Sequence, residues 1–475
     1  MNQILDSVLE EFAKLAAIPR PSKHEAAVSN FLRDYLAELG FSVAQDLHKN
    51  IIAEIPATSG CENSPVTILQ AHMDMVCVAE TGYDFDPLKS PIKLIRTEKF
   101  LEAEGTSLGA DDGIGVAEII YIVKQAKNFP HGKLRVIFTV DEEQGMSGAL
   151  NLDAKNFADA EFLINCDSEI FDELVVGSAG NVHVDFARQI NFVAPNENFT
   201  TAVKIKISGL KGGHSGLEIE KNRANAVKVM ENFLREIRKR GNFQLADFEA
   251  GTAPNVIPNA AEIVIVTDLI APEIEECGEV LKNLVRKIYG ENLRVEVAVA
   301  QMPEKVLSAE DFESLASLIA AIHSGVYSVD GAAPLTSANL GILKTGENLE
   351  VNVLARSNVS ELLAEFINLF AQIGKMSGFD VEFGTTVPAW DLKPNSRLTE
   401  IMAEIFERQN GFAPKIHTSH GGLEGSFFAA KNPALDIVST GTTNENIHSP
   451  QERLHLETVA PHVNLIIETL KKIAE

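Results

Sequence analysis

The chain has 475 residues, 45% of them hydrophobic, and a formal net charge of −26 from 67 acidic and 41 basic side chains. This length predicts two or three domains, and the acidic excess argues against nucleic acid or an anionic membrane as a partner. No apolar run approaches the ~20 residues of a membrane span, and we find no signal-peptide pattern. The four cysteines have no close spacing, so we expect reduced thiols and a cytoplasmic location.

Helices and strands alternate over the first part of the chain. Apolar residues recur at helical spacing from Ile4 to Ala16, and two prolines soon afterwards end that helix. Ser22 and Glu25 form the pattern of a capping box, which predicts a second helix that ends near Gly40. The alternation continues to about residue 185 and predicts a layered α/β domain.

Several apolar or glycine-rich runs end in a residue that can bind a metal. These residues are His72 with Asp74, Asp111, Asp141-Glu142-Glu143 and Asp167, and a fifth site is His448 in a polar loop near the C-terminus. Functional residues of an open α/β sheet lie at the carboxyl ends of its strands. One such residue alone usually marks a turn, but the five sites together indicate a metal centre built across a sheet.

The middle of the chain has a different order of elements. We expect strands and helices in the order βαββαβ at 201–207, 222–240, 243–250, 261–267, 273–289 and 292–300. A comparable order follows, with helices at 309–325 and 359–376 and strands near 334–341, 349–355 and 379–384. This pattern indicates a duplicated βαββαβ unit.

After Pro388 the α/β pattern returns, with a final helix at 456–473. We therefore expect a discontinuous first domain that carries an insertion, as domains with neighbouring termini allow. The predicted boundaries are 1–186 and 385–475 for the first domain and 187–384 for the inserted one.

The residue types of the candidate centre indicate its chemistry. His72 and Asp74 share one face of a strand, so the carboxylate could fix the tautomer of a metal-binding imidazole; the alternative is a salt bridge or a turn. Asp111 lies among small residues that let the backbone approach an ion, and its two oxygens could bridge two metals. Its neighbour Asp112 is the weaker candidate, and a helix cap is the alternative reading of this turn.

Glu142 and Glu143 point in different directions at a strand end, so one could bind a metal while the other faces a water molecule. A metal lowers the pKa of bound water from about 15.7 toward ~7, and a nearby carboxylate can take the proton and return it. Asp167 and His448 complete a set of two imidazoles and three carboxylates. This set favours two Zn²⁺ per chain, with Mn²⁺ or Co²⁺ as possible substitutes.

These motifs resemble metallopeptidase family M20, the dizinc aminoacylases, carboxypeptidases and dipeptidases. The strings Ile18-Pro-Arg-Pro-Ser22, Gly212-Gly-His-Ser-Gly216 and His448-Ser-Pro-Gln-Glu-Arg453 are similar to its aminoacyl-histidine dipeptidase branch. The resemblance implies an α/β fold: a discontinuous catalytic domain with a mixed central sheet, and an inserted α+β lid domain. It also implies a cis peptide bond between Asp111 and Asp112.

The resemblance implies a role for each side chain of the centre. Asp111 would bridge both ions. His72 and Asp167 would hold the first ion, and Glu143 and His448 would hold the second. Glu142 would act as the general base and acid, and Asp74 would support the metal-binding imidazole of His72.

In the inserted domain, His214 matches a family histidine that helps to stabilise the tetrahedral oxyanion. The alternative is a helix-capping histidine in a glycine-rich turn. In relatives with smaller lids this histidine comes from a second subunit, but a doubled lid could let one chain supply it. Both a monomer and a homodimer are therefore compatible with the sequence.

The resemblance implies four substrate contacts. Asn255 is similar to a lid asparagine near the substrate, and Arg356 is the candidate for gripping the terminal carboxylate bidentately. Gly421 and Gly422 are similar to a loop along which a short peptide lies. The alternatives are a turn asparagine, a surface arginine and ordinary loop glycines. Because the branch pattern has Ala-Gly where His420 is followed by Gly-Gly, the fine specificity stays open.

The combined expectation is a dizinc dipeptidase that acts on small peptides, of the Xaa-His type. The alternative enzyme is an aminoacylase or tripeptidase of the same family. The alternative of another class is a non-catalytic, metal-dependent binding protein, against which the presence of Glu142 weighs.

Overall fold

The computed structural model describes residues 3–475, which form two compact units. Unit 1 runs to Gly177 and also contains Leu392–Thr418 and Leu423–Glu475. Unit 2 contains Ser178–Asp391 and Ser419–Gly422. The chain thus leaves unit 1, builds unit 2 and returns, so the predicted discontinuous α/β domain with an insertion is confirmed.

An eight-stranded mixed sheet forms the centre of unit 1. Its strands, in spatial order, are β1 (Ser42–Gln45), β2 (Ile51–Ile55), β6 (Leu134–Thr139), β3 (Val66–His72), β7 (Ala160–Asn165), β23 (Asp436–Ser439), β8 (Glu173–Ser178) and β22 (Lys415–Ser419). The inner strands β6, β3, β7 and β23 are parallel. They are almost wholly buried, which explains their nearly continuous apolar sequences.

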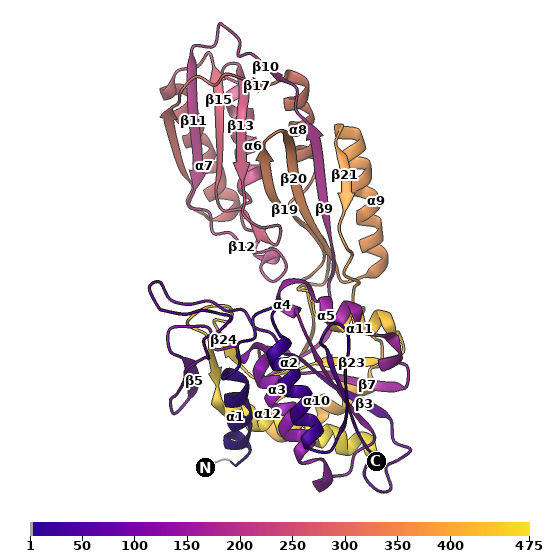
Figure 1. Ribbon diagram of the computed structural model, residues 1–475. Coiled ribbons are helices and arrows are strands. Elements are labelled where there is room, and N and C mark those ends of the chain that lie inside the picture. Colours follow the sequence, from indigo (N-terminus) through magenta and orange to yellow (C-terminus); the bar gives the residue numbers. More distant parts are fainter. Residues whose placement is uncertain (1–2) are drawn as a thin grey trace. The chain divides into compact units, whose positions relative to one another are not determined.

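Helices cover this sheet (Figure 1). They are α1 (Gln3–Ala16), α2 (Ala26–Glu38), α3 (Ala110–Lys124), α4 (Glu142–Gly145), α5 (Ser147–Asn151), α10 (Arg397–Asn410), α11 (Gly425–Lys431) and α12 (Leu456–Ala474). α3 packs against β3, and α1 and α12 pack against α3. The helical spacing of α1 turns Val8, Phe12 and Leu15 into the core, where each is at most 1% exposed. A small sheet has the order β24 (Asn444–Glu445), β25 (Arg453–His455), β5 (Phe100–Ala103), β4 (Leu94–Arg96).

Unit 2 is built on a nine-stranded antiparallel sheet. Its main path is β16 (Arg294–Val299), β11 (Thr201–Ser208), β15 (Ala261–Thr267), β13 (Phe243–Ala250), β19 (Ala333–Thr345), β20 (Asn348–Ser357), β9 (Gly180–Gln189) and β21 (Asp380–Phe383), and β18 (Gly325–Asp330) pairs with β19. Two short ladders join β10 (Phe192–Val193) to β17 (Val306–Leu307) and β12 (Gly213–His214) to β14 (Val256–Ile257).

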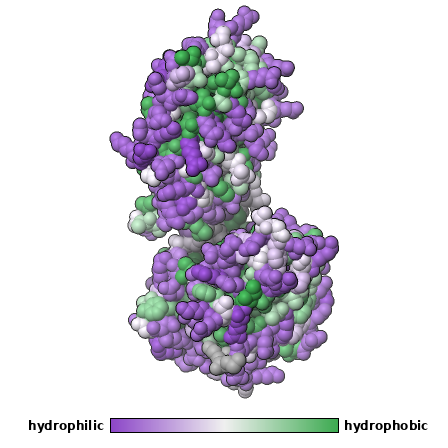
Figure 2. Space-filling view, turned by 90° about the vertical axis from the view of Figure 1, so that its left-hand side faces the viewer, coloured by the Kyte–Doolittle hydropathy of each residue, from purple (hydrophilic) through white to green (hydrophobic). Residues whose placement is uncertain are grey.

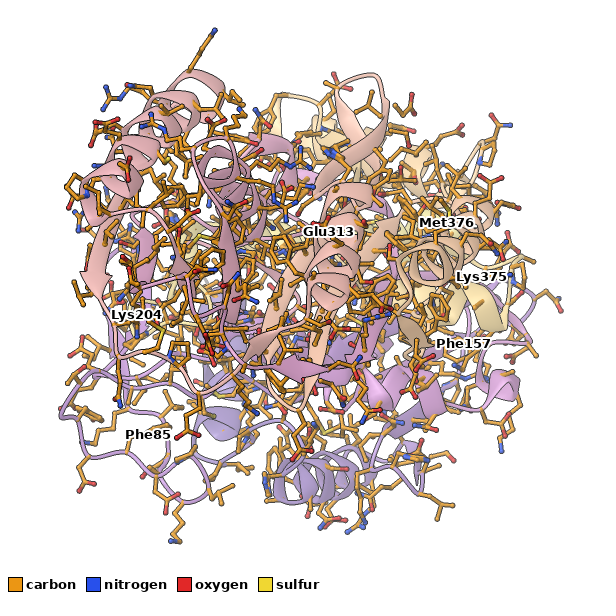
Figure 3. The ribbon with its side chains drawn as sticks, turned by 90° about the horizontal axis from the view of Figure 1, so that it is seen from above. Phe85, Phe157, Lys204, Glu313, Lys375 and Met376 are labelled. Atoms are coloured by element: carbon orange, nitrogen blue, oxygen red, sulfur yellow. The ribbon has the colours of Figure 1, made fainter. Side chains whose placement is uncertain are left out.

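The large sheet consists of two copies of one motif that meet where β13 pairs with β19. From its outer edge inward, the first copy has the order β16-β11-β15-β13 and the second has β21-β9-β20-β19. The helices α6 (Ala226–Arg238) and α7 (Ala271–Tyr289) of the first copy correspond to α8 (Ala309–Ala321) and α9 (Ser360–Ser377) of the second. α8 contacts α6 and α9, and Figure 3 shows α8, marked by Glu313, beside α9, marked by Lys375 and Met376. The predicted duplication is confirmed.

The boundaries between the units differ from the predicted ones at 186/187 and 384/385. Unit 2 begins at Ser178, because β9 is the first strand of the second copy and pairs with β20 along its whole length. It ends at Asp391, since bridges from Ser178 to Trp390 and from Asn181 to Val387 hold the outgoing and returning segments together. The sequence-based boundary cut through β9, because its partner strand lies far along the chain.

The outer surface agrees with the composition of the chain. Figure 2 shows a face on which hydrophilic residues predominate and smaller hydrophobic patches interrupt them. Among residues 3–475, we find no helix whose length and apolar character would suit a bilayer crossing. All four cysteines are free thiols.

Candidate metal centre

Three neighbouring parallel strands deliver most of the predicted residues to one edge of the unit 1 sheet. β3 ends at His72, β6 leads to Asp141 and the short helix α4, and β7 leads to Asp167. Since β3 lies between β6 and β7, their carboxyl ends meet at one point. Asp111 is an exception to the expected pattern, because it lies in the first turn of α3 and not after a strand.

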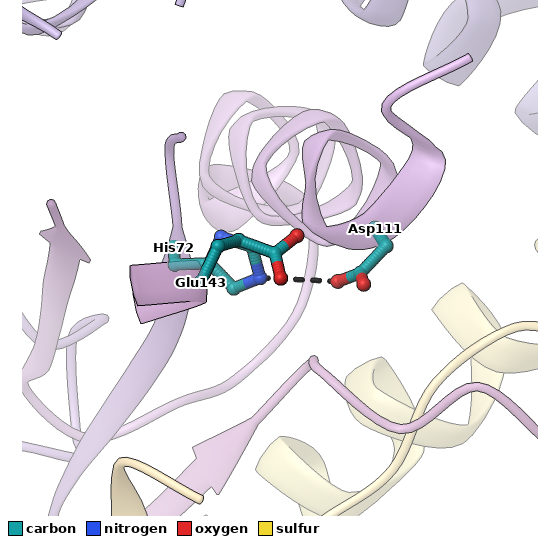
Figure 4. A group of neighbouring side chains, drawn as sticks. All are labelled: His72, Asp111 and Glu143. Atoms are coloured by element: carbon teal, nitrogen blue, oxygen red, sulfur yellow. Dashed lines mark hydrogen bonds and ion pairs between the residues drawn. The ribbon is translucent and has the colours of Figure 1, made fainter. Parts of the chain in front are cut away.

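The carboxylate of Asp111 lies between two imidazoles. Its Oδ1 is 3.0 Å from Nε2 of His72, and its Oδ2 is 3.1 Å from Nε2 of His448. Asp167 Oδ1 lies 3.3 Å from His72 Nε2, and Glu143 Oε2 lies 2.8 Å from His448 Nε2. Figure 4 shows His72, Asp111 and Glu143 pointing toward one another. The five side chains therefore form two histidine–carboxylate pairs that share Asp111.

The neighbour of Asp111 has a different position. The carboxylate of Asp112 is 2% exposed and accepts the backbone N–H of His72 at 3.1 Å. A carboxylate oxygen of Asp112 also lies within 4.8 Å of one ligand atom of His72 and one of Asp167. Asp112 therefore lies at the edge of the centre. The peptide bond between Asp111 and Asp112 is cis, which confirms that prediction.

The charge and the unpaired atoms of these side chains suit a divalent cation. Burial, followed by the neighbouring carboxylate of Asp111, raises the pKa of Glu143, and Glu143 Oε1 is buried without a hydrogen-bond partner. Burial is also the largest influence on Asp167 and raises its pKa to about 6. Crowded carboxylates of this kind are stabilised by a cation, and two imidazoles with three carboxylates and no thiolate suit zinc-like ions. The residues therefore fit the expected metals.

Asp74 supports the centre from behind His72. Its side chain is fully buried, and Oδ1 lies 3.4 Å from Nδ1 of His72, on the other side of the ring from the candidate ligands. Burial raises the pKa of Asp74, but the interactions with His72, with Ser22 and with the backbone N–H of Glu142 together lower it below its usual value. Asp74 also accepts the backbone N–H groups of Glu142 at 3.1 Å and Glu143 at 3.4 Å. One carboxylate thus ties the end of β3 to the start of α4.

The predicted capping box is wrong, because both of its side chains serve this region. Ser22 Oγ donates to Asp74 at 2.8 Å, and the carboxylate of Glu25 accepts the backbone N–H of Asp141 at 2.9 Å. Glu25 is the N-cap residue of α2, but its side chain does not cap the helix. The segment before α2 therefore braces the strand ends of the centre.

The sequence analysis missed a layer of buried polar side chains that lies beneath the centre, mostly on the same strands. The fully buried carboxylate of Glu424 accepts hydrogen bonds from Gln70 Nε2 at 2.6 Å and Thr139 Oγ1 at 2.7 Å. Asn165 Nδ2 donates in turn to Gln70 Oε1. Burial raises the pKa of Glu424 to about 8. The sequence did contain a signal for this layer. Each of the apolar strands β3, β6 and β7 has a polar residue shortly before the candidate metal-binding residues that lie at or just after the end of the strand.

In unit 2, the segments that contain His214 and Asn255 lie side by side. β12 and β14 pair His214 with Val256, and the backbone N–H of Ser215 donates to the Asn255 carbonyl at 2.8 Å. Nδ1 of His214 accepts the backbone N–H groups of Gly216 at 3.2 Å and of Leu217 at 3.1 Å. A ring nitrogen that accepts carries no proton, so the neutral imidazole has its hydrogen on Nε2.

Arg356 is a buried cation without an acidic neighbour. Its side chain is 5% exposed, its Nε has no hydrogen-bond partner, and no carboxylate of residues 3–475 forms an ion pair with it. Burial lowers its pKa to about 10. Buried charges are normally paired, so this guanidinium is a candidate anion-binding group. It is therefore not the surface arginine that was the alternative reading.

The glycine-rich loop after β22 lies beside this arginine within unit 2. His420 Nδ1 donates to Asn358 Oδ1 at 2.5 Å, which leaves Nε2 to accept from Ser337 Oγ at 2.8 Å. A Cβ on Gly216 would lie 2.8 Å from the His420 carbonyl oxygen and 3.3 Å from Cζ of Arg356. The turn of His214, Arg356 and the segment that contains Gly421 and Gly422 therefore meet in one place.

The fold has a mixed sheet covered by helices, and two imidazoles and three carboxylates meet near the ends of its parallel strands. This combination is typical of a metal-dependent hydrolase. The profile of peptidase family M20/M25/M40 matches residues 68–472, and the chain belongs to this family. The resemblance found in the sequence is thereby confirmed.

Two relatives match nearly from end to end. The chain is 34% identical over 471 residues to the cytosol non-specific dipeptidase of Escherichia coli, covering 97% of this chain and 96% of that protein. The crystal structure of an aminoacylhistidine dipeptidase from Vibrio alginolyticus has a TM-score of 0.86 at 30% identity, covering 98% of this chain and 96% of that one. An aminopeptidase from Bacillus cereus, with a TM-score of 0.58 at 19% identity, shares the fold.

Proposed function

We propose that the chain is a dipeptidase that uses two divalent cations, with Zn²⁺ as the first candidate, and that aminoacyl-histidine dipeptides are among its substrates. The observation that carries this proposal is the position of Asp111, with one oxygen toward His72 and the other toward His448. The end-to-end likeness to two dipeptidases supports the substrate class.

His72 and Asp167 would hold one cation, Glu143 and His448 the other, and Asp111 both. When bound, the cations would polarise the scissile carbonyl, lower the pKa of a water molecule and favour ionised carboxylates nearby. Asp74, whose Oδ1 lies 3.4 Å from Nδ1 of His72, would help to hold the ring with Nε2 directed at its ligand site. The name of the Escherichia coli relative supports a cytoplasmic location.

Glu142 would transfer the proton. Burial, followed by the charge of Asp167, raises the pKa of Glu142 well above its usual range. A carboxylate with a raised pKa accepts a proton from the attacking water more readily near neutral pH and can return it to the leaving amine. No hydrogen bond of its carboxylate to another residue of 3–475 competes with this role.

Unit 2 would bind and orient the substrate. His214 would donate through Nε2–H to the developing oxyanion, because Nδ1 is engaged by two backbone N–H groups. Arg356 would bind the free terminal carboxylate of the peptide, since its guanidinium is buried without an acidic partner. Asn255 would contact the substrate beside His214, and Gly421 and Gly422 would let its backbone approach closely.

The experiment is a substrate panel with protein loaded with Zn²⁺, Mn²⁺ or Co²⁺, for the wild type and for Glu142→Gln. We expect cleavage of Xaa-His and other dipeptides by the wild type, and almost none by the variant. A preference for N-acyl amino acids would assign an aminoacylase, and one for tripeptides a tripeptidase. A folded, metal-loaded protein that cleaves none of these substrates would be a binding protein.

A further inference from the structure

The carboxylate of Glu452 holds the loop that carries Asp111. Glu452 is 3% exposed and lies four residues after His448. Its Oε2 accepts the backbone N–H groups of Leu108 at 2.8 Å and Gly109 at 3.0 Å, and its Oε1 accepts those of Ala110 at 2.8 Å and Asp111 at 3.4 Å. One buried side chain thus engages four consecutive N–H groups.

Arg20 holds the same loop from its carbonyl side. It is 1% exposed, and its Nη2 donates to the Gly109 carbonyl at 2.5 Å. Its Nη1 donates to the carbonyls of Met73 at 3.0 Å and Asp74 at 2.9 Å, directly after His72. Arg20 therefore connects the end of β3 with the loop before Asp111, whereas Glu452 connects that loop with the segment of His448.

The two connections reach different pairs of candidate ligands. Arg20 spans from the strand end of His72 to the loop of Asp111, and Glu452 spans from the segment of His448 to the same loop. We propose that Arg20 and Glu452 are positioning residues, each of which sets the geometry of a different cation: Arg20 that of the His72 ion, and Glu452 that of the His448 ion. This inference rests on the proposed two-metal function.

The chemistry of the loop explains why these residue types are needed. A glutamine at 452 would replace one carboxylate oxygen with an NH₂ group, which cannot accept and would face two backbone N–H donors. A lysine at 20 keeps the charge but lacks the fork that reaches carbonyls on two segments. The loop itself is tightly packed, since a Cβ on Gly109 would lie 2.5 Å from Met75 Sδ and 2.7 Å from Arg20 Nη2.

The test is titration of the metal-free protein with Co²⁺, followed by its visible absorption and by calorimetry, without any substrate. We expect the wild type to bind two ions, Glu452→Gln to bind one of them about 10- to 100-fold more weakly, and Arg20→Lys to weaken the other one to a similar extent. Asp436→Asn is the matched control: Asp436 is also buried and accepts the backbone N–H of Leu398 at the start of α10 at 3.1 Å. It should bind both ions as the wild type does.

A second series assigns each effect to its ion. Glu143→Ala removes a candidate ligand of the His448 ion and should leave one tightly bound ion. Adding Glu452→Gln to Glu143→Ala should change the affinity of this remaining ion less than threefold, whereas adding Arg20→Lys should weaken it about 10- to 100-fold. If Glu452→Gln does not fold, as judged by circular dichroism, Glu452→Asp takes its place, since its shorter side chain cannot reach all four N–H groups.

The outcomes separate the two proposals. Equal weakening of both ions by either substitution, or an unchanged affinity for both, would overturn the separate positioning roles of Arg20 and Glu452. A wild-type protein that binds fewer than two ions would instead overturn the proposed function.

Discussion

The neighbours Glu142 and Glu143 are both held by the carboxylate of Asp74, but their side chains have different surroundings. Both backbone N–H groups donate to Asp74. The Glu143 carboxylate lies 2.8 Å from the imidazole of His448, whereas that of Glu142 makes no hydrogen bond to another of the described residues. A glutamate paired with a candidate ligand suits a metal ligand, and one whose carboxylate makes no hydrogen bond suits a proton carrier.

This divergence predicts opposite results for the two alanine variants. Glu142→Ala should bind both cations and lose about 10²- to 10⁴-fold in kcat, the usual contribution of a general base. Glu143→Ala should lose one cation, because it removes a candidate ligand. Elemental analysis and the rate on one dipeptide measure both effects. Full metal content in Glu143→Ala together with depleted metal in Glu142→Ala would exchange the two roles.

Arg356 should determine whether the free terminus of the substrate is recognised. Arg356→Ala removes a charged partner of the carboxylate, a loss of roughly 1.5–3 kcal/mol or about 10- to 150-fold in kcat/KM. The variant should lose this factor on dipeptides with a free carboxylate and little on C-terminally amidated dipeptides, which the wild type should already cleave poorly. Equal proportional losses on acid and amide substrates would show that Arg356 does not bind the carboxylate.

His214 should carry its proton on Nε2 in the absence of substrate, because two backbone N–H groups point at Nδ1. Two-bond ¹H–¹⁵N correlation spectra of histidine-labelled protein report this tautomer directly, and His214→Gln identifies its signal. The same variant should lose about 10²- to 10³-fold in kcat, as for other oxyanion donors, with unchanged metal content. A spectrum with the proton on Nδ1 would contradict the proposed donation.

The pH dependence of stability should include a contribution from Glu11. This residue is 3% exposed and accepts from Lys124 Nζ at 2.6 Å, Lys14 Nζ at 2.8 Å and Tyr35 Oη at 2.9 Å, so it joins α1, α2 and α3. Burial raises the pKa of Glu11, but these three partners outweigh it and lower the pKa below its usual value. Its stabilisation is therefore present above the unfolded-state pKa and lost as the pH falls through the folded-state pKa.

Glu11→Gln should accordingly lower the free energy of unfolding by about 1–2 kcal/mol at pH 7, since two of the partners are partly exposed. The difference from the wild type should shrink as the pH falls below about 4. Urea unfolding at several pH values measures it. Glu10→Gln, an exposed glutamate on the same helix, is the control and should show a much smaller difference at every pH.

Patterns local in the sequence predicted much of this molecule. The strands that end near His72 and Asp167 were predicted by their apolar runs, because parallel strands buried on both faces need such sequences. The order of elements in unit 2 followed from periodicity in the same way. What the sequence did not reveal depends on contacts between distant segments: β9 belongs to unit 2 because of its pairing with β20.

The charged side chains that support the centre, Arg20 and Glu452, could not be predicted for a related reason. The roles of Arg20 and Glu452 follow from the backbone path before Asp111, where Gly109 has φ 69° and four N–H groups point the same way. No spacing in the sequence indicates that path. Ser22 shows the converse, since a local pattern predicted a helix cap but the hydroxyl bonds to Asp74.

The ladder of β10 and β17 places the two ends of the first copy of unit 2 next to each other, with Phe192 opposite Leu307 and Val193 opposite Val306. A short turn could therefore replace residues 194–305 without altering the path of the second copy. The part of β19 around Leu343 would then lose its neighbour β13 and become a free sheet edge, and free edges pair with other chains. Such a shortened protein should self-associate through this edge. The duplication thus supplies within one chain a neighbour that a single-copy protein would have to recruit from another molecule.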